Sequence, residues 1–312
     1  MDVESVETFL AVIETGTVTG AAARLHVTQA TVSKRMGALE DELGYKLIER
    51  RRGVRSVTVT VRGEQFEPLA RQWLSIARDM KALGAGDNRS EFNVATAATV
   101  GIFALGDAFR SFACKHPDVR FGMETHHTDE VCDLVERRIF DVGYAFAPSP
   151  HGDLVSKPVY REQMMVLTPQ GSGLSDAVEP SQLNASAEIH LKLGDSYESW
   201  NERYWPRGGY RISVAPAFLV SDYLGDPGSW ALVPQSVAHE YRERFGFEAH
   251  RLAVEAPSLL CYQIEPRRLS HNASHFIRLL EAEVRLVVAA TDGLDPFEPW
   301  MLGDVNTVER MR

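Results

Sequence analysis

Three short helices with regularly spaced apolar residues are predicted near the start of the sequence, and they constrain the fold more than any other feature. In the first helix, apolar side chains recur at i, i+3, i+4 and i+7 and so form one buried face: Val6, Phe9, Leu10 and Ile13. Gly16 is predicted to end that helix, and Thr17 to cap a second helix over 18–25. Thr28 is predicted to cap a third helix over 29–43.

The third predicted helix has one apolar face and a polar N-terminal half. Its buried stripe consists of Val32, Met36, Leu39 and Leu43, which leaves exposed the polar side chains of Gln29, Thr31, Ser33, Lys34 and Arg35. Two short helices joined by a tight turn, the second led by polar side chains, are typical of a helix-turn-helix. Two short predicted strands at 47–48 and 56–60 surround the run Arg50-Arg51-Arg52-Gly53, which indicates a basic β-hairpin, or wing.

The residues between 9 and 63 also carry a family resemblance. They contain, in order and without gaps, Phe9-x2-Val12, Thr15-Gly16-Thr17, Ala21-Ala22-x2-Leu25, Val27-Thr28-Gln29, Val32-Ser33-Lys34, Leu39-Glu40, Leu43-Gly44, Leu47-Ile48-Glu49-Arg50, Val59-Thr60 and Gly63. This series resembles the LysR-type transcriptional regulators. Mild departures are Ala30 and Val61, where the family often has Pro, and Ile48, where it usually has Phe.

The resemblance implies that the third helix contacts DNA in the major groove. Glutamine can bond adenine bidentately and lysine can reach guanine acceptors, whereas serine and threonine are permissive. The residues assigned to DNA on this basis are Thr28, Gln29, Thr31, Ser33 and Lys34, with the wing residues Arg51, Arg52 and Arg55 tracking phosphates or entering the minor groove. For any single wing arginine, an ordinary exposed turn position explains its presence equally well.

The distribution of charge supports this assignment. The whole chain has a formal net charge of −10, but its first 90 residues carry 13 basic and 12 acidic side chains. Over 24–62 the sequence has nine basic and four acidic residues, so a locally basic segment is attached to an acidic body. That pattern fits a DNA-facing module joined to a domain that does not bind DNA.

Other sequence features exclude several classes of protein. The longest stretch without a charged residue has 15 residues, 92–106, which is too short for a transmembrane helix. An acidic N-terminus is unlike a signal peptide, and an odd count of 3 cysteines argues against a disulfide scaffold. We therefore expect a cytoplasmic protein.

A heptad-like seam follows the wing. Thr60 is predicted to cap a helix to about residue 83, and apolar residues spaced 3-4-3-4-3 line one face: Phe66, Leu69, Trp73, Ile76, Met80 and Leu83. We predict that this seam pairs two protomers, although an amphipathic helix packed on its own domain would show the same pattern. The resemblance implies an antiparallel pair of linker helices and a tetramer. The small and polar segment 84–90 is the predicted hinge.

The remaining chain is predicted to be an α/β domain of parallel construction. Strand-like and helical segments alternate at 92–97, 102–116, 119–124, 129–138 and 141–146, and further apolar strands are predicted at 164–167, 189–193, 218–220 and 230–233 before a helix over 270–290. This order resembles the family's effector-binding domain, two lobes of the type II periplasmic-binding-protein fold.

The predicted fold class is therefore α/β and multidomain. The domains comprise a winged helix-turn-helix over 1–60, a linker helix and hinge over 61–90, an effector-binding domain over 91–290 and a tail over 291–312. Lobe I is predicted to cover 91–161 and 266–290, and lobe II 162–265. The sequence does not decide whether the tail packs on the body or on a partner.

Ligands of open α/β sheets bind beyond the carboxyl ends of strands, near helix N-termini. Applied to the predicted elements, this rule selects as effector-binding residues Thr96, Thr99, Val100, Thr128, Phe146, Asp195, Ser196 and Ser221. Hydroxyls and helix-end amides suit a small anion such as a carboxylate, although each hydroxyl could equally be only a helix cap. Asp195 would disfavour an anion beside it.

No motif of nucleophilic, nucleotide or metal chemistry stands out. His126-His127 with Asp129 lacks a third ligand at helical spacing, so we predict no metal site and no cofactor. Cys114 and Cys132 lie at apolar helix positions, which favours buried thiols over a redox pair. A thiol switch, an enzyme built on the α/β domain and an architectural DNA-binding protein remain the alternatives.

The most consistent hypothesis is a transcriptional regulator that is not an enzyme. We expect it to bind an imperfect dyad in double-stranded promoter DNA, to bind a small effector between its lobes and to associate with itself. The resemblance adds RNA polymerase as a further partner, and the lack of a long apolar stretch predicts no membrane partner. Effector identity, target genes and the direction of regulation are not encoded in any motif of the sequence.

Overall fold

The computed structural model describes residues 1–50, 56–82, 90–205 and 208–298. Its N-terminal module consists of α1 (Val3–Thr15), α2 (Val18–Arg24), α3 (Gln29–Leu43) and the antiparallel strands β1 (Ile48–Arg50) and β2 (Val57–Val59). The predicted caps are confirmed, because the Thr17 and Thr28 hydroxyls accept hydrogen bonds from the backbone N–H groups of Gly20 and Thr31. Gly16 follows α1 with φ of 66°, a conformation that favours glycine.

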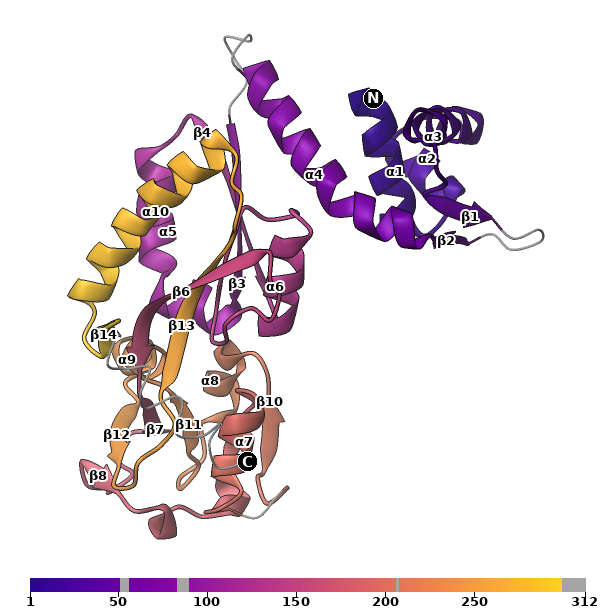
Figure 1. The fold of residues 1–312 in the computed structure, drawn as a ribbon. Helices are drawn as coiled ribbons and strands as arrows, with labels where there is room; N and C mark the ends of the chain where they lie inside the picture. The colour runs from indigo at the N-terminus through magenta and orange to yellow at the C-terminus, as the bar shows by residue number, and fades with distance from the viewer. Residues whose placement is uncertain (51–55, 83–89, 206–207, 299–312) are drawn as a thin grey trace.

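Helix α4 (Val61–Ala82) leaves this module as a long linker (Figure 1). Thr60 caps it, since its hydroxyl accepts a hydrogen bond from Gly63 N–H at 3.0 Å. Gly63 is required by a close approach, because a Cβ there would lie 2.2 Å from the Leu47 carbonyl oxygen. The first half of α4 joins the core of the N-terminal module, where the Phe66 and Phe9 rings are 5.3 Å apart.

Lobe I contains a six-stranded sheet in the order β14-β6-β13-β5-β3-β4. Its strands are β3 (Ser90–Ala97), β4 (Val119–His126), β5 (Val142–Ala145), β6 (Leu154–Glu162), β13 (Leu259–Pro266) and β14 (Leu294–Pro296). The strands β3, β4 and β5, over which parallel construction was predicted, do pair in parallel, and the antiparallel β6, β13 and β14 make the sheet as a whole mixed. The fold is nevertheless the predicted α/β arrangement.

Helices cover both faces of that sheet. The π-helix η1 (Val100–Ala104), α5 (Gly106–Lys115) and α10 (His271–Ala290) pack on one face, and α5 and α10 lie side by side (Figure 1). Helix α6 (Thr128–Glu136) packs on the other face through Val131, Cys132 and Val135. Among the helices of the described residues, none is long and apolar enough to cross a membrane.

Lobe II contains a four-stranded sheet in the order β11-β7-β12-β8 and the parallel pair β9 and β10. The strands are β7 (Met164–Thr168), β8 (Ala177–Val178), β9 (Ile189–Leu191), β10 (Ile212–Val214), β11 (Ala231–Pro234) and β12 (Glu248–Leu252). The helices are α7 (Asp195–Asn201), α8 (Val220–Tyr223), which follows the short η4 (Ala217–Leu219), and α9 (Gln235–Phe245). The strand predicted at 218–220 is therefore wrong, because that segment is helical.

Two strands, β6 and β13, connect the lobes and pair antiparallel along their length. Strand β13 begins with Leu259 opposite Glu162 and runs through the sheet of lobe I to Pro266, so the predicted return near Glu265 falls at the end of this strand. The beginning of the tail packs on the same sheet, where β14 pairs with β6 and Phe297 N–H donates to the Val159 carbonyl oxygen at 3.0 Å. Residues 299–312 of the tail lie outside the described residues.

Candidate DNA-binding and effector sites

Helix α3 presents a polar N-terminal surface over an apolar underside. Val32 and Leu39 are fully buried, whereas Gln29 and Lys34 are exposed and Ser33 is half-buried. Thr28 and Thr31 are partly used by the helix itself, because their hydroxyl oxygens lie 2.9 Å apart at the cap. Gln29 and Lys34 are therefore the residues best placed to reach a partner.

A buried carboxylate fixes α3 to the start of the wing. Glu40, at 7% exposure, accepts hydrogen bonds from the Leu47 and Ile48 N–H groups at 2.9 and 3.2 Å and from Lys46 Nζ at 2.7 Å. Burial opposes ionisation of Glu40, but these hydrogen bonds outweigh it and lower its pKa. We did not predict this role, for which the only sequence signal was an acid next to the apolar stripe.

The wing is described only at its two strands. Strand β2 pairs antiparallel with β1. Ser56, just before β2, forms an antiparallel β-bridge with Thr17 of the N-terminal module. The predicted contacts Arg51, Arg52 and Arg55 lie outside the described residues. Their assignment to DNA therefore stays a prediction.

On the effector side, the three predicted residues that follow β3 in lobe I are all buried. Thr96 is fully buried and donates its hydroxyl to the Ala97 carbonyl oxygen at 3.1 Å, and the Val100 side chain is also fully buried. Gly101 permits this close packing, since a Cβ there would lie 2.4 Å from Thr96 Cγ2. Thr96 and Val100 thus serve the fold through their side chains. Thr99 leads into η1, is also buried at 7% exposure and makes no side-chain cap bond.

The other predicted effector residues are divided between lobe I and lobe II. Phe146, after β5, packs against the apolar clusters of both lobes. Thr128 begins α6 and is half-buried. In lobe II the Ser221 hydroxyl donates to the Phe218 carbonyl oxygen at 3.3 Å. Asp195 and Ser196 begin α7, and their side chains are outside what the structure describes.

An aromatic contact joins the two lobes directly. Phe103 of η1 meets Tyr241 of α9 edge-on, with ring centroids 5.5 Å apart and an interplanar angle of 88°. Phe103 thereby packs against the apolar cluster of lobe II. Movement of one lobe against the other must change this contact. Because the sequence pattern did not show which lobe Phe103 would face, we did not predict it.

A chain of ion pairs connects the N-terminal module, the linker and lobe I. Arg71 on α4 lies 2.8 Å from Glu14 of α1 and 3.1 Å from Glu67, and it is only 9% exposed. Glu67 in turn accepts from Arg137, which follows α6, at 2.7 Å. Arg24 extends the chain at 2.7 Å from Glu14. We name these five residues the linker relay.

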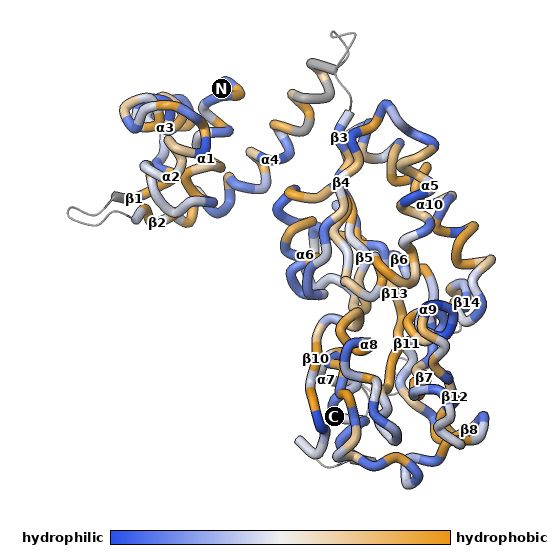
Figure 2. Tube along the Cα trace, turned by 180° about the vertical axis from the view of Figure 1, so that it is seen from behind, coloured by the Kyte–Doolittle hydropathy of each residue, from blue (hydrophilic) through white to orange (hydrophobic). Residues whose placement is uncertain are grey.

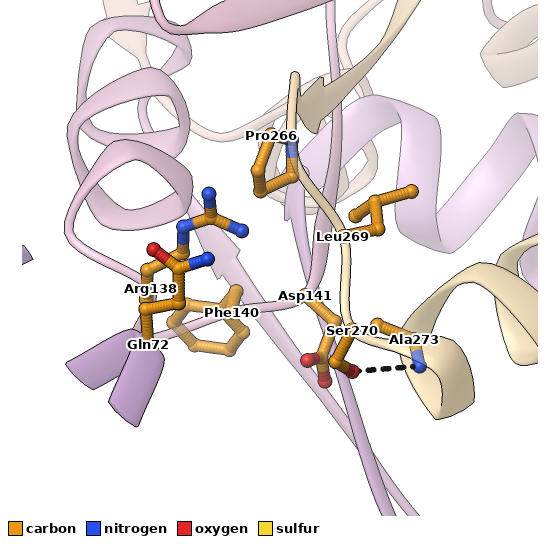
Figure 3. A pocket seen from close by; sticks show the side chains of 8 residues that line it. All are labelled: Gln72, Arg138, Phe140, Asp141, Pro266, Leu269, Ser270 and Ala273. Carbon is orange, nitrogen blue, oxygen red and sulfur yellow. Dashed lines mark hydrogen bonds between the residues drawn. The ribbon is translucent and has the colours of Figure 1, made fainter. Parts of the chain in front are cut away.

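A small pocket of about 30 Å³ lies beside the relay (Figure 3). Gln72 of α4, Arg138 and Phe140 of the loop after α6, and residues at the start of α10 line it. Arg138 has φ of 59°, which is unusual for a residue other than glycine. Burial lowers the pKa of its guanidinium, although the nearby charges of Asp141 and Asp153 act in the opposite direction. The loop after α6 is therefore held in a specific conformation against the linker.

Only part of the predicted dimer seam is exposed to solvent and could contact a second protomer. Leu69, Ile76 and Met80 are 61%, 42% and 60% exposed, and their spacing places them on one face of α4. Phe66 is a correction, because at 6% exposure it belongs to the core of its own chain, and Trp73 is half-buried against the same core. Leu83 lies outside the described residues.

The cysteines do not form a pair of buried thiols. Cys132 is buried, and burial raises its pKa, which disfavours the reactive thiolate. Cys114 is exposed, contrary to our prediction. Cys261 is also buried, in strand β13 of the lobe I sheet, and burial raises its pKa.

Two buried acid–base groups lie in or next to lobe II. His190 of β9 is 2.9 Å from Glu188 and 2.8 Å from Glu198 of α7. Burial opposes its protonation, but the two carboxylates outweigh burial and raise its pKa. Glu162, at the end of β6, is fully buried and accepts from Ser236 N–H at 2.9 Å, and burial raises its pKa to about 7.

These features define a protein in which a winged helix-turn-helix is joined through a long helix to a two-lobed α/β domain. Residues 3–64 match the family model described as bacterial regulatory helix-turn-helix protein, lysR family, and residues 85–285 match the LysR substrate binding domain. The second match alone covers more than half of the chain. The chain therefore belongs to the LysR family.

Individual relatives are more distant. The chain is 27% identical over 173 residues to the HTH-type transcriptional regulator DgcR of a Pseudoalteromonas species. This alignment covers 54% of this chain and 59% of DgcR. The chain thus spans little more than half the length of that relative in the alignment.

Solved structures resemble the chain over more of its length. A full-length OxyR variant from Pseudomonas aeruginosa has a TM-score of 0.70 at 20% identity, covering 96% of this chain and 99% of its own. LysG of Corynebacterium glutamicum with bound effector Arg has a TM-score of 0.63 at 18% identity, covering 91% and 98%. At these identities the likeness shows the fold.

Proposed function

We propose that this protein is a sequence-specific DNA-binding transcriptional regulator controlled by a small molecule. The observation that carries the proposal is the exposed polar start of α3, with Gln29 and Lys34 projecting above a fully buried Val32. Helices that enter the major groove present such side chains to base edges. Membership of the LysR family supports the same function.

A second copy of the chain is the proposed partner of α4. Leu69, Ile76 and Met80 expose an apolar stripe on a helix whose other face is already packed. Pairing of two linker helices would bury the stripe and present two α3 helices to a dyad in DNA. A tetramer and RNA polymerase follow only from the resemblance.

The proposed effector binds where the lobes meet, near Thr99, Thr128, Phe146 and Ser221. LysG, which shares this fold, is described with an effector bound. An anionic group of the effector would find better support near Thr99 than at α6, because the first turn of α6 carries Asp129 and Glu130. We therefore propose a small metabolite whose anionic group lies toward the start of η1.

The linker relay offers a route from that site to DNA. Differential affinity of the effector for two arrangements of the lobes would shift their populations, and Arg137 connects lobe I to Glu67 on the linker. An enzyme has no comparable support, because belonging to the LysR family points to regulation.

The test is a thermal-shift screen of small metabolites against the full-length protein, followed by DNA-binding titrations with each hit. A ligand that raises the melting temperature and changes DNA affinity supports the proposal. Thr99→Val, which removes a hydroxyl and keeps the shape, should weaken that ligand. Ligands that bind tightly without altering DNA affinity would contradict effector control.

A further inference from the structure

Two carboxylates and a histidine meet on the surface of lobe I. Asp133 and Glu136 lie one turn apart on α6, and His151 approaches from the connection between β5 and β6. His151 Nε2 is 2.9 Å from Asp133 Oδ1, and Nδ1 is 3.2 Å from Glu136 Oε2. One ligand atom from each of the three residues lies within 4.8 Å of the others.

We propose that Asp133, Glu136 and His151 form a binding site for a divalent transition-metal cation. Imidazole nitrogen together with carboxylate oxygen is a donor set for zinc and manganese, with metal–ligand bonds of about 2.0–2.2 Å. Ligand atoms around such an ion are separated by about 3–3.5 Å. The separation between His151 Nε2 and Asp133 Oδ1 is already close to this spacing, whereas the short contact with Glu136 uses the other ring nitrogen.

The charges at the cluster call for a cation. Within the described part of the chain, no lysine or arginine forms an ion pair with Asp133 or Glu136, whose partner is His151. Helix α6 contains no basic residue, and Asp129 and Glu130 add to its negative charge. In Figure 2 this helix is largely hydrophilic on its outer side. A divalent ion would balance the two carboxylates.

The segment that carries His151 is fixed before any ion binds. His151 N–H donates to the Ser149 hydroxyl at 3.1 Å, Ser149 N–H donates to the Ser156 hydroxyl at 2.8 Å, and Leu154 N–H donates to the His151 carbonyl oxygen at 3.2 Å. The histidine therefore lies on the connection between β5 and β6, which has its own hydrogen bonds, whereas the two acids lie on α6. Preorganised donors of this kind reduce the entropic cost of binding.

Binding requires one local rearrangement. Both ring nitrogens of His151 now face carboxylates, and a single ion can take only one of them as a ligand. Metal binding would therefore turn the ring so that one nitrogen joins both oxygens. Arg137 of the linker relay follows Glu136 directly, which places the site beside the contact between lobe I and α4.

The experiment uses the full-length protein, stripped of metal by chelation and titrated separately with zinc and with manganese chloride in a calorimeter. We expect one ion per chain with micromolar or tighter affinity. His151→Gln and Asp133→Asn, which preserve size, should each weaken binding at least tenfold. Melting curves without metal would check that both variants fold, and DNA binding plays no part in the readout.

A matched control is His126→Gln on the same lobe. His126 also approaches carboxylates, at 3.5 Å from Glu124 and 3.9 Å from Glu130, and its substitution should leave metal affinity unchanged. Three outcomes would overturn the proposal. They are the absence of binding at micromolar metal, equal affinity in His151→Gln and the wild type, and loss of binding in His126→Gln alone, which would place the ion elsewhere.

Discussion

Glu67 of the linker helix accepts two hydrogen bonds from the Arg137 guanidinium, at 2.9 Å from Nε and 2.7 Å from the terminal nitrogen. The same carboxylate oxygen lies 3.1 Å from Arg71, which is paired with Glu14 of α1. One carboxylate therefore stands between the DNA-side module and the effector-side lobe. A change in lobe I that moved Arg137 would therefore alter its hydrogen bonds to Glu67 on α4.

Removing either partner tests this connection. Glu67→Gln should lower the free energy of unfolding by about 1–3 kcal/mol, because it leaves the largely buried Arg71 with one partner fewer. Arg137→Gln should cost only about 0–1 kcal/mol, since this side chain is 45% exposed. Denaturant unfolding of both variants and the double variant gives the coupling energy. Strict additivity would show that the contact contributes nothing.

The exposed stripe of α4 can be separated from its buried side. Ile76→Glu should weaken self-association strongly while leaving the fold intact, because Ile76 is 42% exposed. Phe66→Ala is the contrasting variant and should cost about 3–5 kcal/mol of stability, since it opens a cavity in the core. Sedimentation velocity reports the first effect and denaturant unfolding the second. Unchanged association of Ile76→Glu would argue against linker pairing.

Glu162 predicts a pH dependence. Its pKa is raised to about 7 in the folded protein from an ordinary value of 4.5, so the folded state favours the protonated carboxyl. The stability that this group contributes is fully present below about pH 4.5 and is lost as the pH rises through 7. The loss amounts to about 3 kcal/mol above that range.

Substitution by an uncharged isostere removes this dependence. Glu162→Gln keeps an oxygen for the Ser236 N–H group and should be more stable than the wild type at pH 8.5 but not at pH 5. Glu240→Gln, on the exposed side of α9, is the control and should follow the wild-type curve. If stability changed with pH in the same way in Glu162→Gln and the wild type, the pKa of Glu162 would not differ between the folded and unfolded states. That result would contradict the prediction.

The sequence predicted the N-terminal module well because its signals are local. Caps such as Thr28 and the stripe from Val32 to Leu39 act within one helix, and the structure confirms them. The apolar run Phe218-Leu219-Val220 fits a strand and a buried helix equally well, and its helical form is set by tertiary packing. Strand β12 escaped prediction because His250 and Arg251 interrupt its apolar pattern.

The site residues divide in the same way. The exposure of Gln29 and Lys34 follows from helical periodicity, whereas the burial of Thr96 depends on how closely Gly101 packs against it. Contacts such as Glu67 with Arg137 join residues far apart in the chain and leave no local pattern to read. Cys114 was placed wrongly because a helix position next to apolar residues can still face solvent.

DNA recognition by α3 is most directly tested by competition binding of the full-length protein. DNA sites would be selected from genomic fragments with the wild-type protein, and specific and random duplexes compared at one salt concentration. Gln29→Ala should lose about 1–3 kcal/mol of specific binding and little non-specific affinity, while Gln170→Ala, an exposed glutamine of lobe II, should behave as wild type. Equal discrimination by Gln29→Ala and the wild type would contradict base contact by the start of α3.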